Sequence, residues 1–111
     1  MSDPASIVAA RLADLWRASR PTVLERVAIL VDAQAALSAD PFNADARSRG
    51  REAAHKLSGV LGVFGLPRGS ELAAAIEEIL KSGEPLSSGD LAVLAEKIAA
   101  LDAVIASKGD S

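Results

Sequence analysis

A single histidine, His55, is the residue of this 111-residue chain best suited to chemistry. Near pH 7 much of an exposed imidazole is neutral, and its free ring nitrogen can act as a nucleophile toward a phosphoryl group. Such a transfer asks a protein mainly for positioning and charge stabilisation, and the cations Arg51 and Lys56 stand close to His55 along the chain. Glu52 is placed to hold one ring N–H and thereby fix the tautomer.

The surrounding sequence predicts that His55 points outward from the middle of a long helix. At about 100° per residue, an apolar face lies opposite the ring; it is formed by Ala46, Ala53, Leu57, Val60 and Phe64. Small and polar residues surround the ring itself, namely Ala44, Ser48, Arg51, Gly59 and Gly62. Because glycine inside a helix costs about 1 kcal/mol relative to alanine, the two glycines indicate room for another macromolecule to approach His55.

Less specific interpretations of the same residues stay open at this point. A lone histidine on a helix is commonly an ordinary solvated residue, and the basic run Arg47, Arg51 and Lys56 is commonly a solvated face. Glycines can also mark a helix distortion or a tight crossing with a neighbouring helix. A metal site is not supported, because the chain has no second histidine and no cysteine.

Composition limits the class of protein. Hydrophobic residues make up 50% of the chain but aromatic residues only 3%, which favours a helical core of Leu, Ile, Val and Ala. The net charge of −3 argues against nucleic-acid binding, which needs a basic footprint. No apolar run approaches the ~20 residues that span a bilayer. We therefore expect a cytoplasmic protein with neither a nucleic-acid nor a membrane partner.

Turn and cap residues divide the chain into five predicted helices. Pro21 is expected to end a first helix at about 4–18 and to open a second, because proline suits the first helical turn and not the interior. Asp40 and Pro41 predict the N-cap and first turn of a helix that carries His55 to about residue 64. Two further helices are predicted over about 67–81 and 88–107. Short connections then give one domain, 1–111: an all-α, up-and-down antiparallel four-helix bundle over about 21–107 with an additional N-terminal helix.

The stretch around His55 resembles the histidine-containing phosphotransfer (HPt) domain. The family pattern is roughly A-H-x-L-K-G, then an apolar residue and glycine five to six positions on, then an apolar pair and L-E in the next helix. The matching residues are Ala54, His55, Leu57, Gly59, Phe64, Gly65, Leu72, Ala73, Ile76 and Glu77. Three departures are Ser58, where the family usually has lysine, Gly69, where it usually has leucine, and Pro67 in the turn before the next helix.

The resemblance implies a phosphorelay intermediate in two-component signalling. His55 would accept a phosphoryl group from a receiver-domain aspartate, or from a kinase, and pass it to another receiver domain. Arg51, Lys56 and Ser58 would stabilise the phosphoryl group. The partner would dock on Arg47, Ser48, Glu52, Gly59, Gly62 and Val63. The protein would be a monomeric carrier without kinase or ATPase activity and without a cofactor, and magnesium would belong to the receiver of a response regulator or hybrid histidine kinase.

Two other functions fit the same sequence. A docking module that binds a receiver or kinase without carrying phosphate would keep the bundle and its surface, and Ser58 keeps this alternative open. A dimerisation domain would use the apolar seam of the last helix, from Leu91 to Ile105.

Overall fold

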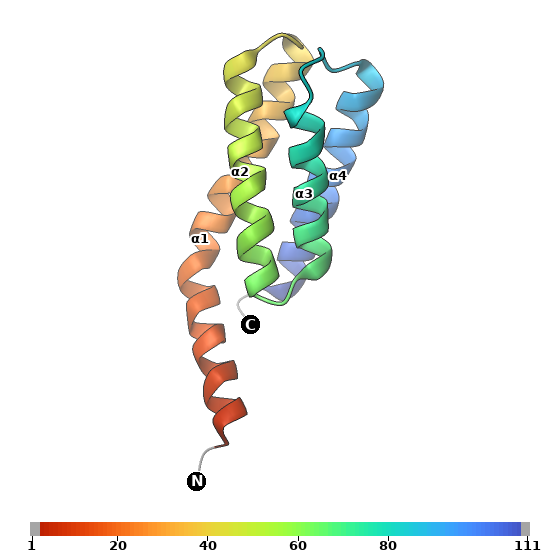
Figure 1. Cartoon of the computed structure of the whole chain (residues 1–111). Coiled ribbons are helices and arrows are strands. Elements are labelled where there is room, and N and C mark those ends of the chain that lie inside the picture. Colours follow the sequence, from red (N-terminus) through yellow and green to blue (C-terminus); the bar gives the residue numbers. More distant parts are fainter. Residues whose placement is uncertain (1–2, 110–111) are drawn as a thin grey trace.

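The computed structural model describes residues 3–109, and within this range the protein is a bundle of four α-helices without strands. The helices are α1 (Pro4–Ala39), α2 (Ala44–Val63), α3 (Pro67–Lys81) and α4 (Ser88–Lys108). Consecutive helices run antiparallel, and α4 returns to pack against α1 (Figure 1). None of the described helices is long and apolar enough to cross a membrane.

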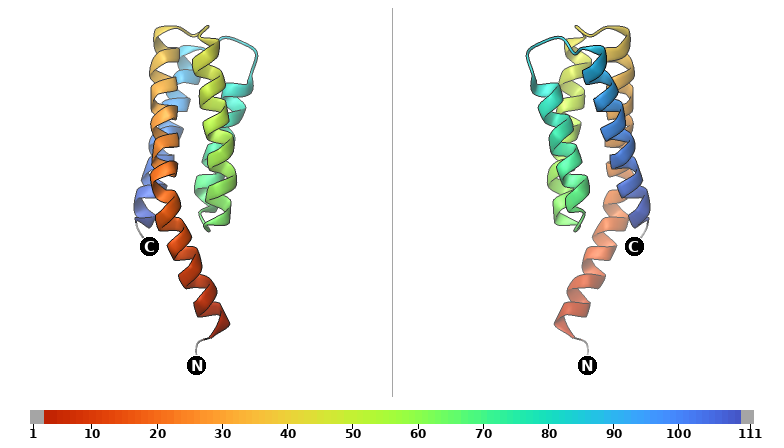
Figure 2. Two further views of the ribbon diagram at one scale, coloured as in Figure 1. Left: turned by 90° about the vertical axis from the view of Figure 1, so that its left-hand side faces the viewer. Right: turned by 90° about the vertical axis from the view of Figure 1, so that its right-hand side faces the viewer.

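The additional N-terminal helix predicted over 4–18 does not exist as a separate element. Instead, α1 is one continuous helix of 36 residues with Pro21 inside it. It bends where it leaves the bundle, and its N-terminal part runs on past the end of the other helices (Figure 2). We call this part, residues 4–15, the overhang.

Packing on both sides of Pro21 explains why the proline bends the helix without ending it. A proline in a helix interior removes one hydrogen bond and clashes with the preceding turn, at a cost of about 3 kcal/mol. Trp16 on one side and Val23 on the other are both almost completely buried. The Trp16 indole also donates a hydrogen bond of 2.7 Å to the Gly109 carbonyl at the end of α4. These contacts hold the segment before the proline against the bundle.

The start of α2 also differs from the prediction, which placed the N-cap at Asp40 and the first turn at Pro41. Asn43 is the N-cap, and its side chain accepts a hydrogen bond of 3.0 Å from the Ala46 amide. Asp40 instead follows the last residue of α1, and its carboxylate accepts from the Phe42 amide. The residues between form a short turn, so α1 and α2 can lie side by side.

The last two helices begin and end close to the predicted residues. The structure has α3 over the predicted range, and α4 starts after Ser87, which forms a capping box with Asp90. The core between the helices consists of Leu, Ile, Val and Ala side chains with Trp16 at one end. On α2 the buried face includes Ala54 and Leu61, whereas Val60 and Phe64, both predicted to be core, are only partly buried.

Gly50 lets α2 approach its neighbours closely. A Cβ atom at this position would lie 3.0 Å from the Ala33 Cβ on α1 and 3.0 Å from a methyl group of Leu80 on α3. Because an alanine Cβ cannot move without its backbone, an added methyl group would push α1 away from α2. Gly59, also on α2, has no atom within 4 Å of the equivalent position.

These two glycines should therefore respond oppositely to the same substitution. We expect Gly50→Ala to lower the free energy of unfolding by about 1–3 kcal/mol through overpacking. Gly59→Ala should raise it by about 0.5–1 kcal/mol, because alanine favours the helix and meets open space. Urea unfolding followed by circular dichroism measures both values. Equal effects of the two substitutions would contradict the close approach at Gly50.

The cap of α4 should make stability depend on pH. Hydrogen bonds from the Ser87 backbone and side chain hold the pKa of the Asp90 carboxyl below its ordinary value of 3.8. A carboxyl whose pKa is lower in the folded protein adds stability above its unfolded pKa, and this stability is lost as the pH falls through the folded pKa. We expect Asp90→Ala to lower the melting temperature at pH 7 and to have progressively less effect below pH ~4. A difference from the unsubstituted protein that stays constant with pH would contradict this role.

Candidate functional site

His55 lies in the middle of α2 and points away from the core, as predicted. Its side chain is 75% exposed. The neighbouring Ala54 and Leu57 are completely buried, so the helix itself is anchored directly beside the ring. A rigid helix thus presents an accessible imidazole.

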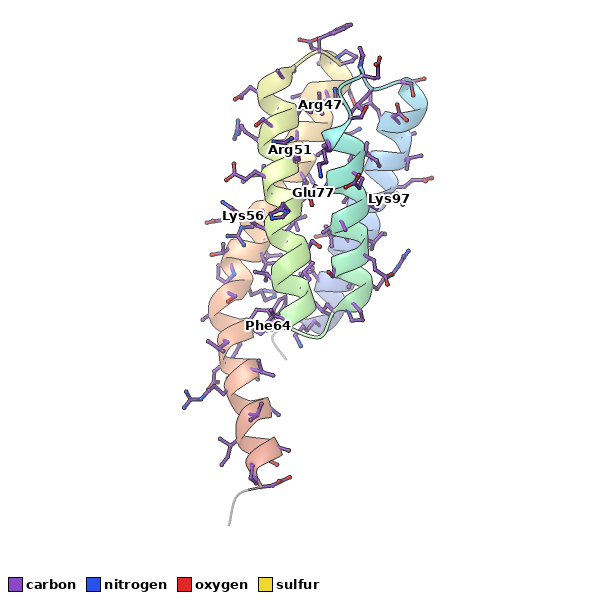
Figure 3. The ribbon with its side chains drawn as sticks, in the orientation of Figure 1. Arg47, Arg51, Lys56, Phe64, Glu77 and Lys97 are labelled. Atoms are coloured by element: carbon purple, nitrogen blue, oxygen red, sulfur yellow. The ribbon has the colours of Figure 1, made fainter. Side chains whose placement is uncertain are left out.

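Glu77 on α3 holds the ring from across the helix interface. The His55 Nδ1 atom lies 3.0 Å from one carboxylate oxygen of Glu77 and 3.2 Å from the other. The Glu77 side chain is only 20% exposed. Figure 3 shows Glu77 on α3, across from Arg51 and Lys56 on α2.

This contact selects one tautomer of the ring. A carboxylate only accepts hydrogen bonds, so we infer that Nδ1 carries the proton and donates it to Glu77. In a neutral imidazole the other nitrogen, Nε2, then keeps its lone pair. Within residues 3–109, Nε2 has no hydrogen-bond partner, which leaves it available to a molecule arriving from outside.

The two predicted cations near the ring differ in their surroundings. Lys56 forms an exposed ion pair with Glu52, at 2.9 Å, and this hydrogen bond holds the pKa of the Glu52 carboxyl below its usual value. Glu52 is therefore engaged by Lys56, and Glu77 occupies the place beside the ring that the sequence suggested for Glu52. Arg51 is exposed, one turn before His55, and makes no ion pair with any residue in the described part of the chain.

Ser58, the residue in place of the family's usual lysine, faces α3. The Ser70 hydroxyl donates a hydrogen bond of 2.8 Å to the Ser58 carbonyl, and the two hydroxyl groups lie 3.4 Å apart. Both residues are partly buried. Ser58 thus joins the two helices mainly through its backbone carbonyl, about one turn after the histidine.

The predicted docking residues near the start of α2 fall into two groups. Arg47 is partly buried, and its Nε–H donates a hydrogen bond of 2.9 Å to the Leu80 carbonyl at the end of α3. Its Nη2 atom is buried without a partner, so this guanidinium is directed into the fold. Ser48 and Glu52, in contrast, are exposed.

The docking residues after His55 form an open, largely apolar surface. Gly59 faces open space, and an added Cβ at Gly62 would meet only the Ser70 hydroxyl, at 3.6 Å. Val63 is 68% exposed. A shallow groove between α2 and α1 runs along this surface; it is lined by Arg26, His55, Lys56, Gly59, Val60, Val63 and Phe64.

Phe64 connects this groove to the overhang end of α1. Its ring lies 5.3 Å from the Trp16 ring, edge to face at 66°. The Lys108 ammonium lies 5.5 Å from the centre of the same Trp16 ring. Side chains of α1, α2 and α4 therefore pack together at the Phe64 end of the groove.

Sequence reasoning had missed Glu77 as a partner of the ring and Arg26 as a wall of the groove. Both come from helices other than α2, and helical periodicity on one helix does not give its rotation relative to another. The signal for Glu77 was present, because it ends the L-E part of the family pattern, but it was not connected to the imidazole.

The Glu77 contact can be tested by NMR, because His55 is the chain's single histidine and gives one set of ring signals. We expect the neutral ring of the unsubstituted protein to be predominantly protonated on Nδ1 in ¹⁵N spectra above pH ~8. Glu77→Met removes the acceptor and should shift the population toward the Nε2-protonated tautomer. Glu78→Met, the exposed neighbour, should leave it unchanged. An unchanged tautomer ratio in Glu77→Met would show that the contact does not orient the proton.

Comparison with known families adds an independent finding. The family model for the Hpt domain matches residues 10–104, which is most of the chain and includes all of α2 and α3. Searches of curated proteins and of solved structures gave no significant match. The match covers well over half of the sequence and agrees with the helical bundle and its exposed histidine; the chain belongs to the Hpt domain family, the phosphotransfer modules of two-component signalling.

Proposed function

We propose that His55 is the phosphoacceptor of a phosphorelay, taking a phosphoryl group from a receiver-domain aspartate, or from a kinase, and passing it to another receiver domain. The observation that carries the proposal is that the two nitrogens of the His55 ring have different surroundings. Nδ1 is held by Glu77 at 3.0 Å, whereas the side chain is 75% exposed. The nitrogen that a partner can reach is therefore the unprotonated one.

In the proposed transfer one bond to phosphorus forms and one breaks, and the leaving group comes from the receiver and not from this chain. The Nε2 lone pair forms a bond to the phosphorus of the aspartyl phosphate, the bond from phosphorus to the carboxylate oxygen breaks, and the aspartate leaves as a carboxylate. The phosphorylated ring keeps its proton on Nδ1 and gains positive charge. Glu77 stabilises this charge through a charge-assisted hydrogen bond. Transfer to the next receiver is the same step in reverse.

Arg51 and Lys56 are the proposed cations for the phosphoryl oxygens. An exposed ion pair such as Lys56–Glu52 contributes at most about 1 kcal/mol, so Lys56 can exchange Glu52 for a more highly charged phosphoryl group. Arg51 makes no ion pair within residues 3–109 and lies one turn from the ring. Ser58, which the resemblance placed with them, is engaged with Ser70 and would contribute less.

The same proposal assigns the partner surface. Gly59, Gly62 and Val63 would admit the receiver's loops, because they leave the surface beside the ring low and apolar. Ser48 and Glu52 would contact its edge. Arg47 would contribute indirectly, by holding the C-terminal end of α3.

The proposal makes the protein a carrier, in keeping with a family of phosphocarrier modules that are not kinases. It needs no cofactor of its own, and magnesium would be bound by the receiver. It also assumes a monomer in the cytoplasm whose partners are receiver domains of response regulators or hybrid kinases, with no nucleic-acid or membrane partner.

A docking module that never carries phosphate is the second candidate, and Ser58 favours it. The Ser58 hydroxyl lies 3.4 Å from the Ser70 hydroxyl. The lysine that the family usually has at this position, and that would hold a phosphoryl group, is absent. On this alternative the exposed surface around Gly59 would bind a receiver and block its other contacts.

His55→Gln separates the two candidates. Incubation with a panel of isolated receiver domains, phosphorylated with acetyl phosphate, should label the unsubstituted protein with an acid-labile, base-stable phosphoryl group. We expect His55→Gln to lose this label completely, because glutamine offers no nucleophilic nitrogen, and to retain receiver binding. If the unsubstituted protein binds receivers but never acquires the label, the docking module is the correct function.

A further inference from the structure

The strongest feature left unexplained is the apolar side of the overhang. Val8 is 58% exposed, Leu12 39% and Leu15 51%, although all three are large apolar side chains on one short stretch of α1. Figure 2 shows that this stretch extends past the ends of the other helices, so no part of the described chain covers it. A row of exposed apolar side chains commonly marks a surface that binds another molecule.

The rotation of α1 shows where this apolar side faces. At about 100° per residue, Val8, Leu12 and Leu15 lie within about 40° of the rotational position of Arg26. Arg26 lines the groove between α1 and α2 together with His55 and Lys56. The three side chains, which we call the overhang row, therefore continue the α1 wall of the His55 groove beyond the bundle.

The groove and the overhang row meet at Phe64. This residue lines the lower end of the groove, and its ring packs on Trp16, the residue that follows Leu15. Val63 beside it is 68% exposed. A single apolar surface thus leads from His55 along Gly59 and Val63 to Leu15, Leu12 and Val8.

We propose that the overhang row is the second half of the receiver-docking surface, which contacts the receiver domain while its phosphoaspartate is at His55. This inference rests on the proposed function, and it adds a contact area remote from the reacting atoms. The overhang would act on affinity and partner choice, whereas Glu77 and His55 act on the chemistry.

The dimensions fit a receiver-sized partner. His55 lies nine residues before Phe64, about 14 Å along α2, and Val8 lies eight residues before Trp16, about 12 Å along α1. The surface is therefore about 25 Å long. A domain of ~100 residues has a radius of gyration of about 13 Å and is more than 30 Å across, so one partner spans it.

A second copy of the chain fits the row less well. Two overhangs paired with each other would contribute about 12 residues each, whereas a stable interface uses roughly 20–30 residues a side. A receiver would cover both the overhang, with its 12 residues, and the seven residues that line the His55 groove, and this single interface comes close to that size.

The test compares Val8→Gln/Leu12→Gln/Leu15→Gln with Ile7→Gln. Ile7 is 53% exposed on the same segment but lies about 100° around the helix from Val8. Glutamine keeps the helix propensity, so circular dichroism should be unchanged in both variants. We expect the triple variant to bind the receiver about tenfold more weakly, equivalent to about 1.4 kcal/mol, and to lose kcat/KM for transfer by the same factor. Ile7→Gln should stay within twofold of the unsubstituted protein.

Two further measurements distinguish this inference from the proposed function. Phosphoramidate, a small phosphoryl donor, should label His55 equally in all three proteins, because no docking is needed. If receivers bind the protein but never transfer a phosphoryl group to it, the proposed relay function is wrong. Weaker receiver binding by the triple variant would still support the docking role of the overhang row. Unchanged receiver binding by the triple variant overturns the inference. A triple variant that loses self-association in sedimentation but keeps its receiver affinity also overturns the inference. The overhang row would then be a contact between two copies of the chain.

Discussion

The packing of α3 against α2 is the constraint on which the site depends. His55 and Glu77 belong to different helices, 22 positions apart in the chain, and their hydrogen bond exists only if the two helices keep their rotation and spacing. Completely buried Ala54 and Ala73 stand next to this contact or one turn from it, and they allow the helices to lie close. Gly69 has the same effect further along α3, because a Cβ there would lie 3.1 Å from a Leu61 methyl group. Small side chains in the core therefore help to set the contact between Glu77 and an imidazole at the surface.

The glycines of α2 serve two different purposes, which the sequence alone did not separate. Gly50 is buried and permits contact with α1 and α3, whereas Gly59 is exposed and touches nothing within 4 Å. Glycine lowers helix stability in either case. At Gly50 closer packing of three helices offsets that loss. At Gly59 no contact within the described chain does, which agrees with the proposed role of this residue in access to the neighbouring ring.

The parts of the structure that local rules determine were predictable. The limits of α3 and α4 follow from Pro67, Ser82 and the Ser87–Asp90 capping box, and the outward position of His55 follows from periodicity on a single helix. One failure is local, because the N-cap of α2 is Asn43 and not Asp40. The others involve contacts between helices. Pro21 was expected to end a helix, but burial of Trp16 and Val23 on its two sides outweighs the local cost. Glu52 was expected beside the ring, but Lys56 binds it, and Glu77 reaches the ring from α3.

The two nitrogens of His55 face different surroundings: Nδ1 contacts Glu77 within the fold, whereas Nε2 faces the groove that a partner would occupy. The Nδ1 side is determined inside the molecule, by a carboxylate whose side chain is only 20% exposed and therefore has few other positions. The Nε2 side makes no hydrogen bond within residues 3–109 and faces whatever binds the groove. The bundle thus fixes one side of the ring, and on the proposed function the other side and the surfaces beyond it would select the donor. Among the exposed apolar side chains, Val63 lies in the groove beside the ring, and Val8, Leu12 and Leu15 lie on the N-terminal part of α1.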